Sequence, residues 1–365
     1  MFLKNIKLTN FRNYSSLNFK FQTPVTVLVG DNAQGKSNFL DSIYFLATSK
    51  SSKADKDEEL VKQGEEVSRV EGKVVTSGKS LESSEETSLE IAMQIIPEKG
   101  LAKRVKVNGI PKRVIDYSSN LAVILFSPED LNLVIGAPSI RRSHIDQVIS
   151  QVDKSYKKTL SLYEEVIVRK NRVLKAVKEG RSKINELTYW TDQQILLGNC
   201  LQEKRQQFFD YINNTEKKFG NFNYEYNQNL ITKHRLDEYQ QREIESTNSL
   251  IGPHRDDFIF KLDNLDLSHF GSRGEQRTAV LDLKLAEVSF IEQTLGIRPI
   301  LLLDDIFSEL DISHRQHVVD ISKLQQTIIA AVELDSYLRK HLKEAQIITV
   351  EKGKFNLSSE NVKQV

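Results

Sequence analysis

Hydrophobic and polar positions along the chain follow two different periods. In the first third, short segments alternate between apolar and polar residues or run apolar, which is typical of β-strands. Asn108 and Gly109 predict a hairpin turn within the last of these segments. We therefore expect an antiparallel β layer built from residues 2–8, 17–21, 67–75, 89–96 and 105–115.

A helical period replaces this alternation after residue 126. Ser127 and Pro128 follow an apolar run, as the N-cap and first residue of a helix do. Apolar residues then recur every three or four positions over 145–167, and a second helix is expected over about 184–219, after a break near Gly180. The two helices predict an antiparallel arm of about 50 Å, since a residue adds about 1.5 Å to a helix.

Two further apolar runs do not alternate, and each leads into polar residues. Residues 25–29 precede GDNAQGKS at 30–37, and residues 300–303 precede DDIFSELD at 304–311. Parallel strands that are buried on both faces have this composition, and ligands bind at their carboxyl ends. The sequence therefore predicts an α/β core with its chemistry after these two strands.

The first polar segment fits a P-loop, the phosphate-binding turn between a strand and a helix. Its glycines would let successive backbone N–H groups point at phosphate. Lys36 would reach the β and γ phosphates of ATP, and the Ser37 hydroxyl would ligate Mg²⁺. A plain glycine-containing turn is the alternative. The expected nucleotide-binding residues are Gly30, Asp31, Asn32, Ala33, Gln34, Gly35, Lys36, Ser37 and Asn38.

The second polar segment fits the end of a Walker B strand. Asp304 would hold the Mg²⁺, and Asp305 would activate the attacking water beside the γ-phosphate. Paired carboxylates after a strand could instead begin the next helix. The P-loop elsewhere in the chain favours the catalytic interpretation.

A third motif, SRGEQR at 272–277, precedes a helical apolar stripe. Ser272 and Glu275 fit a capping box, which by itself explains why a helix begins here. A helix N-terminus that carries a hydroxyl and Gly274 can also bind an anion, such as the γ-phosphate of a nucleotide held by a second copy. The two interpretations are compatible.

Four more segments stand in order with these motifs over nearly the whole chain: NFRNY at 10–14, FSPEDLNLV at 126–134, RRSHID at 141–146 and IGPHRDDF at 251–258. The set resembles the RecF family of bacterial recombination mediators. That resemblance implies an α/β fold with an ABC/SMC-type P-loop ATPase head, an antiparallel β layer and an inserted α-helical arm. It assigns Ser272 to the γ-phosphate of the opposite protomer.

The resemblance also implies an activity and partners. It predicts a weak, DNA-stimulated ATPase that acts as a switch, with ATP and Mg²⁺ as cofactors and an ATP-dependent homodimer. It further predicts binding to single-stranded, gapped or junction DNA, assistance to RecA loading in recombinational repair and replication, and RecR- and RecO-type mediators as partners.

Three places depart from the family's pattern, and Asp305 matches the family but differs from most ABC heads. Ala33 stands where glycine is usual, and a left-handed backbone there would cost about 1 kcal/mol. Residues 330–332 offer no histidine or hydroxyl to sense the γ-phosphate. Asp305 is one methylene shorter than the glutamate of most ABC heads, which predicts slow hydrolysis. SSK at 51–53 replaces the usual SFR, so a nucleotide or DNA contact there is open.

Composition limits the remaining possibilities. The 365 residues are 39% hydrophobic and 28% charged, as in an ordinary globular protein, and no run approaches the ~20 apolar residues of a membrane span. Cys200 is the only cysteine, so no intrachain disulfide can form. We expect a cytoplasmic protein with no membrane contact.

The net charge of +1 conceals an uneven distribution. Residues 53–98 hold twelve acids and six bases, whereas residues 141–183 hold twelve bases and five acids. A basic helical stretch is either a solvated face or a surface that follows phosphates. Beside an ATPase head of this type we expect DNA contact, through Arg172, Lys175 and Lys178 on one helix face.

These motifs predict three segments. Residues 1–126 form the N-terminal part of the head, 127–246 the helical arm, and 247–365 the C-terminal part of the head. The loop GPHRDD at 252–257 is either closed by its own ion pair or contacts nucleotide or DNA.

Three other classes of protein use a similar P-loop. An SMC-like, chromosome-organising head would need a longer arm with a hinge. A transporter subunit would carry LSGGQ and a histidine after Walker B, and a nucleotide kinase would need no γ-phosphate group from a second copy.

Overall fold

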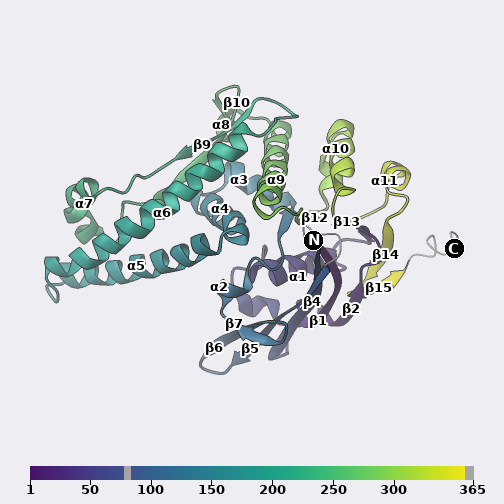
Figure 1. Cartoon of the computed structure of the whole chain (residues 1–365), viewed down its shortest axis with the longest axis horizontal. Coiled ribbons are helices and arrows are strands. Elements are labelled where there is room, and N and C mark those ends of the chain that lie inside the picture. The colour runs from purple at the N-terminus through teal and green to yellow at the C-terminus, as the bar shows by residue number, and fades with distance from the viewer. Residues whose placement is uncertain (78–83, 358–365) are drawn as a thin grey trace. The chain divides into compact units, whose positions relative to one another are not determined.

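The chain divides into two compact units (Figure 1). The computed structural model describes residues 1–77 and 84–357. The head unit comprises residues 1–129 and 291–365, and the arm unit residues 130–290. The sequence predicts residues 247–290 in the head, but they fall in the arm unit. There β10 (Asp257–Leu262) pairs with β9 (Phe222–Asn227), and Leu283 packs in the hydrophobic core of the arm unit.

A sheet of order β15-β14-β3-β13-β12-β8 forms the centre of the head unit. Its strands run parallel, except that β15 pairs antiparallel with β14 at one edge. Every residue of β12 is buried, which explains why its apolar run does not alternate. The strands are β3 (Val25–Val29), β8 (Val123–Phe126), β12 (Ile300–Asp304), β13 (Thr327–Ala331), β14 (Gln346–Glu351) and β15 (Lys354–Leu357).

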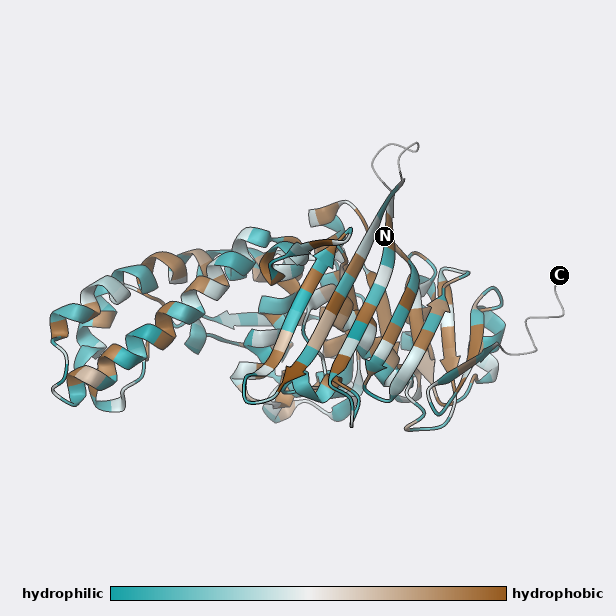
Figure 2. Cartoon of the chain, turned by 90° about the horizontal axis from the view of Figure 1, so that it is seen from below, coloured by the Kyte–Doolittle hydropathy of each residue, from teal (hydrophilic) through white to brown (hydrophobic). Residues whose placement is uncertain are grey.

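An antiparallel sheet of order β2-β1-β4-β5-β6-β7 forms the predicted β layer. Hydrophilic and hydrophobic residues alternate along its strands (Figure 2), as expected for a sheet with one face on the core. Asn108 and Gly109 form the expected turn with φ of 52° and 76°, but residues 105–115 are not one strand. The elements are β1 (Phe2–Phe11), β2 (Tyr14–Lys20), β4 (Val67–Ser77), β5 (Ser84–Ile96), β6 (Gly100–Val107), β7 (Ile110–Lys112) and the short helix α2 (Val114–Tyr117).

Helix α1 (Lys36–Thr48) packs against strands of both sheets. Phe39, Leu40 and Ile43 are fully buried in the core that it shares with them. The buried packing of α1 therefore fixes the position of the residues just before it. Besides α2, the head unit also contains η1 (Asp57–Leu60), η5 (Ile306–Glu309), α10 (Ile312–Ser322) and α11 (Ser336–His341).

The arm unit is mainly helical, and α5 and α6 lie side by side in it with α7 packed on both (Figure 1). The predicted first helix is broken at Asp153, whose carboxylate caps α5 by accepting from the Tyr156 N–H at 2.9 Å. Helix α6 has 28 residues, about 42 Å, and ends at Asn214, before the predicted end at 219. The longer helices are α4 (Pro138–Val152), α5 (Lys154–Lys178), α6 (Leu187–Asn214), α7 (Lys233–Ser246) and most of α9 (Arg273–Leu295).

Shorter elements complete the described chain. They are η2 (Pro128–Leu131), α3 (Asn132–Ile135), η3 (Ile184–Glu186), η4 (Pro253–Arg255), β11 (Leu265–Asp266) and α8 (Leu267–Phe270). Within residues 1–77 and 84–357, no helix combines the length and the apolarity that crossing a membrane requires.

Candidate nucleotide-binding site

The P-loop joins β3 to α1, and its two glycines are required by close packing. A Cβ at Gly30 would lie 2.4 Å from the Val350 carbonyl oxygen. At Gly35, where φ is 113°, a Cβ would lie 2.5 Å from Asn13 Nδ2. A larger residue at Gly30 would clash with backbone, and one at Gly35 would displace the Asn13 side chain and strain a backbone of positive φ.

The middle of the loop is anchored to the turn between β14 and β15. The Gln34 carbonyl accepts from the Gly353 N–H at 2.9 Å, and its side-chain oxygen accepts from the Lys352 N–H at 2.7 Å. Ala33 beside it has φ of 62°. This is the left-handed backbone that glycine tolerates and that is strained for alanine.

Lys36 opens α1 with its ammonium folded onto the loop. Its Nζ donates to the carbonyl oxygens of Gly30 at 2.5 Å and Asp31 at 2.8 Å. Burial lowers the pKa of Lys36, and the nearby carboxylates of Asp305 and Asp304 oppose this effect. The side chain is thus held in the loop where a phosphate would need a cation.

Asp304, at the end of β12, is hydrogen-bonded to Ser37 in the first turn of α1. The Ser37 hydroxyl donates to Asp304 Oδ1 at 2.8 Å, and the carboxylate is 3% exposed. A hydroxyl and a carboxylate are oxygen ligands that Mg²⁺ accepts, and Asp304 already holds a cation, since Lys53 Nζ lies 3.0 Å from Oδ2. The residues therefore fit the metal that the sequence predicts.

Sequence reasoning did not identify the contact between Lys53 and Asp304. The sequence shows SSK only as a departure from the family's pattern with an open nucleotide or DNA contact, because the partner of Lys53 lies 251 residues away. The basic residue at position 53 was the one available signal.

Asp305 adopts a left-handed backbone with φ of 53°, and its N–H donates to the Ala330 carbonyl at 2.9 Å. Burial raises the pKa of Asp305, with a smaller rise from Asp304, against the opposing effects of Lys36 and of the Val332 backbone N–H. The segment that lacks a sensor side chain thus reaches Asp305 through its backbone. A carboxylate of raised pKa beside the phosphate cradle is suited to accept a proton.

The capping box predicted at 272–275 is present at the start of α9, in the arm unit. Glu275 Oε2 accepts from the Ser272 N–H at 2.8 Å, and Ser272 Oγ accepts from the Glu275 N–H at 3.3 Å. A Cβ at Gly274 would find only Ser272 Oγ, at 4.0 Å, so the first turn of the helix is open above it.

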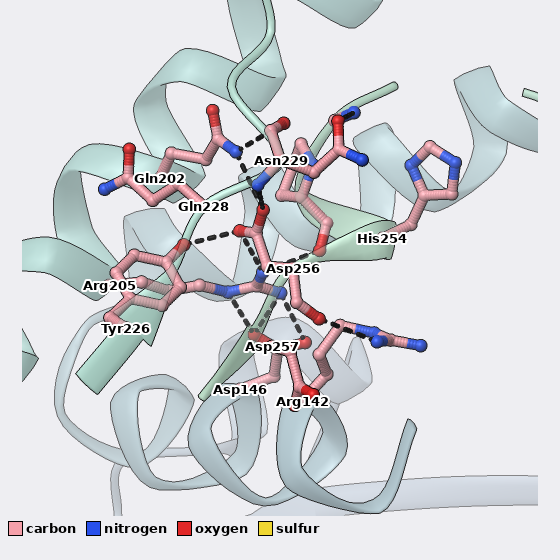
Figure 3. A network of polar contacts seen from close by, with 12 residues as sticks. Arg142, Asp146, Gln202, Arg205, Tyr226, Gln228, Asn229, His254, Asp256 and Asp257 are labelled. Atoms are coloured by element: carbon pink, nitrogen blue, oxygen red, sulfur yellow. Dashed lines mark hydrogen bonds and ion pairs between the residues drawn. The ribbon is translucent and has the colours of Figure 1, made fainter. Parts of the chain in front are cut away.

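The GPHRDD loop is not closed by its own ion pair; its carboxylates pair with the arm helices (Figure 3). Asp256 is 1% exposed and accepts from Arg205 Nη1 at 3.0 Å and Gln202 Nε2 at 2.9 Å. Arg255 instead donates to the Ser249 carbonyl. This loop follows α7 in the chain and leads into β10, and its bonds to α6 make it a structural junction within the arm unit.

The predicted DNA-binding residues Arg172, Lys175 and Lys178 are exposed on α5. Lys178 Nζ donates to the Glu245 carbonyl at 2.6 Å, which fixes it to α7. Two other bases of residues 141–183, Arg141 and Lys170, are buried, and the Lys170 ammonium lies 2.7 Å from the buried Glu243 carboxylate. The base count of this stretch therefore overstates its surface charge.

Comparison with known proteins gives a consistent assignment. The family model of the RecF/RecN/SMC N terminal domain matches residues 2–356. The DNA replication and repair protein RecF of Agathobacter rectalis is 32% identical over 99% of this chain and 100% of its own length. The protein of the same name from Geobacillus kaustophilus is 35% identical over 97% of this chain and 98% of its own.

Solved structures agree with these relatives. A structure of the recombination mediator protein RecF-ATP in the RecFOR pathway is 28% identical, covers 98% of each chain and has a TM-score of 0.87. The Smc head domain of Pyrococcus furiosus, at 16% identity and a TM-score of 0.52, shares the fold alone.

Proposed function

The chain belongs to the RecF family of DNA replication and repair proteins, and from that premise we propose that it is an ATP-dependent DNA-binding switch. It is a weak, DNA-stimulated ATPase that dimerises around two Mg²⁺·ATP. Each site takes Lys36, Ser37, Asp304 and Asp305 from one copy and Ser272 from the other.

The observation that carries this proposal is the 2.8 Å contact between Ser37 and Asp304, with Lys36 and Asp305 beside them in the head unit. The P-loop N–H groups cradle the triphosphate and Lys36 contacts its outer phosphates. Bound Mg²⁺ neutralises charge on the β and γ phosphates. Asp305 orients the attacking water and accepts its proton.

Dimerisation follows from the charge of the nucleotide. A γ-phosphate that meets both a P-loop and the N-terminus of α9 from a second copy is bound more tightly than by either alone. ATP then favours the closed dimer by its differential affinity for that state, and loss of the γ-phosphate releases it. Because ATP hydrolysis is slow, it sets how long the dimer stays bound to DNA.

Arg172, Lys175 and Lys178 contact the DNA in this proposal, which is single-stranded, gapped or junction duplex. Family membership supports a role in recombinational repair and replication with RecA loading, and the solved relative in the RecFOR pathway supports RecR- and RecO-type partners. The SMC-like alternative is less favourable, because α5 and α6 are joined by residues 179–186 alone and α6 spans only about 42 Å.

The test measures mass by light scattering and binding to a gapped duplex, with and without ATP. We expect ATP to drive both in the native chain and in neither Lys36→Met nor Ser272→Arg. Circular dichroism checks that Ser272→Arg, which loses its capping hydroxyl, keeps α9. Dimers and DNA complexes formed by both variants with ATP would rule out the shared site.

A further inference from the structure

Both oxygens of Asp304 are engaged by residues of this chain. Oδ1 accepts from the Ser37 hydroxyl at 2.8 Å and Oδ2 accepts from Lys53 Nζ at 3.0 Å. Asp304 is 3% exposed, so little of the residue is open to solvent beside these two contacts.

The loop that carries Lys53 is anchored to α1. Asp41, fully buried on α1, accepts from Ser51 Oγ at 2.7 Å and from the Ser52 N–H and hydroxyl, both at 2.8 Å. Ser51 Oγ in turn accepts from the Lys53 N–H at 3.0 Å. Since this segment is hydrogen-bonded to α1, the backbone of Lys53 is fixed in the fold.

A second acceptor lies near the ammonium. Glu129 Oε1 is 3.8 Å from Lys53 Nζ, and its side chain is 59% exposed. The Lys53 ammonium is thus close to a buried carboxylate that binds it and to an exposed carboxylate that could receive it.

We propose that Lys53 is an intramolecular rival of the divalent cation for Asp304, and that it transfers to Glu129 when the cation enters. Mg²⁺ binds carboxylate oxygens at about 2.0–2.1 Å, and a second cation hydrogen-bonded to the same group is repelled at that range. Lys53 is therefore a positioning residue that sets the metal affinity and keeps Asp304 neutralised before the metal arrives. This inference rests on the proposed function, because it concerns the same metal site.

The test is an Mn²⁺ titration followed by electron paramagnetic resonance, with ADP and without nucleotide. Lys53→Met should bind Mn²⁺ about tenfold more tightly, the scale of one lost charge-assisted hydrogen bond. Lys53→Arg keeps the charge and should stay near the native affinity. Glu129→Gln should weaken Mn²⁺ binding about two- to fivefold, because the displaced ammonium loses an exposed ion pair.

Lys56→Met is the matched control, since it removes an exposed charge from the same loop. It should leave the Mn²⁺ affinity near native, and ADP affinity in EDTA should be unchanged in Lys53→Met. Unchanged or weaker Mn²⁺ binding in Lys53→Met would overturn the inference. If the native chain bound no ADP, the proposed function would fail, and the titration without nucleotide would still decide the role of Lys53.

Discussion

Ser272 and Glu275 cap the first turn of α9 reciprocally, and the Ser272 hydroxyl also donates to Glu275 Oε2 at 2.8 Å. Hydrogen bonds from Ser272 lower the pKa of Glu275, so this carboxylate is ionised at neutral pH. The residue proposed to bind a γ-phosphate thus carries a negative charge beside it.

Replacing Glu275 by glutamine should strengthen ATP-driven dimerisation. The amide oxygen can still accept from Ser272, so the cap remains, while the charge that repels phosphate is removed. Light scattering at increasing ATP should give a lower half-maximal concentration for Glu275→Gln than for the native chain. Glu275→Ala, which loses the cap as well, separates the two effects. Weaker dimers in Glu275→Gln would mean that the carboxylate itself contributes to the interface.

Asp305→Asn should separate hydrolysis from dimerisation. Asparagine tolerates the left-handed backbone at this position, so the fold of the site is kept while the proton acceptor is lost. We expect phosphate release to fall by about 10²–10⁴-fold and ATP to drive a longer-lived dimer. In the native chain, hydrolysis should decline on acidification at a higher pH than for an ordinary aspartate, because the pKa of Asp305 is raised.

A dimer of Asp305→Asn that dissociates as fast as the native one would show that release does not await hydrolysis. Phosphate release and light scattering on the same sample provide the comparison. The variant without ATP is the reference for dimerisation.

The parts that sequence predicted well are those whose residues are close together in the chain. Ser272 and Glu275 are three residues apart, and the turn at Asn108 and Gly109 is local. The P-loop and Walker B strand were also recognisable, because a buried parallel strand has a distinctive composition.

Contacts between distant segments could not be predicted in the same way. Lys53 and Asp304 meet only because the loop after α1 is fixed by Asp41 near the end of β12. The pairing of Arg205 with Asp256 likewise depends on how α6 packs on the loop before β10 (Figure 3). From the sequence, a basic residue such as Lys170 is expected at the surface. In the structure it is buried together with its partner Glu243, which lies 73 residues away in the chain.

Ala33→Gly should stabilise the head unit. Relief of a left-handed alanine gains about 1–2 kcal/mol, and the greater freedom of glycine in the unfolded chain offsets about 0.4–1 kcal/mol of this. We expect a net gain of roughly 0.5–1 kcal/mol in the free energy of unfolding. Ala137→Gly is the control: this exposed alanine has φ of −68°, so glycine there should destabilise. A loss of stability in Ala33→Gly, measured by urea titration, would contradict the strain argument.

His254 should make the arm unit sensitive to acid. Its Nδ1 lies 2.7 Å from the Tyr163 hydroxyl and its Nε2 3.0 Å from the Ser249 carbonyl, and burial lowers the pKa of His254 to about 4. Above the unfolded pKa of about 6.5 both states are neutral; between 6.5 and 4 only the unfolded chain takes up the proton. Stability should therefore fall by about 2–3 kcal/mol across this window.

Trp190, the only tryptophan, lies on α6 and reports unfolding of this unit by fluorescence. Carboxylates also titrate in acid. The informative quantity is therefore the difference in acid-induced stability loss between the native chain and His254→Gln. His254→Gln is less stable at pH 7 but should lose less stability between pH 7 and 4.5. Parallel losses in the two proteins would assign the acid sensitivity elsewhere.

Arg172 and Lys175 should contribute to DNA affinity without sequence preference. Both are exposed on α5 one turn apart, where cations can follow a phosphate backbone. Replacing both by glutamine should weaken binding to a gapped duplex and reduce the slope of log affinity against log salt by about 1.4–1.8, since each phosphate contact contributes about 0.7–0.9. Lys154→Gln with Lys158→Gln removes the same charge from exposed positions near the start of α5 and should change neither quantity. If both pairs lower affinity equally, the general charge of the arm unit binds DNA; if neither does, the arm's basic face is only solvated and the DNA site lies on other residues.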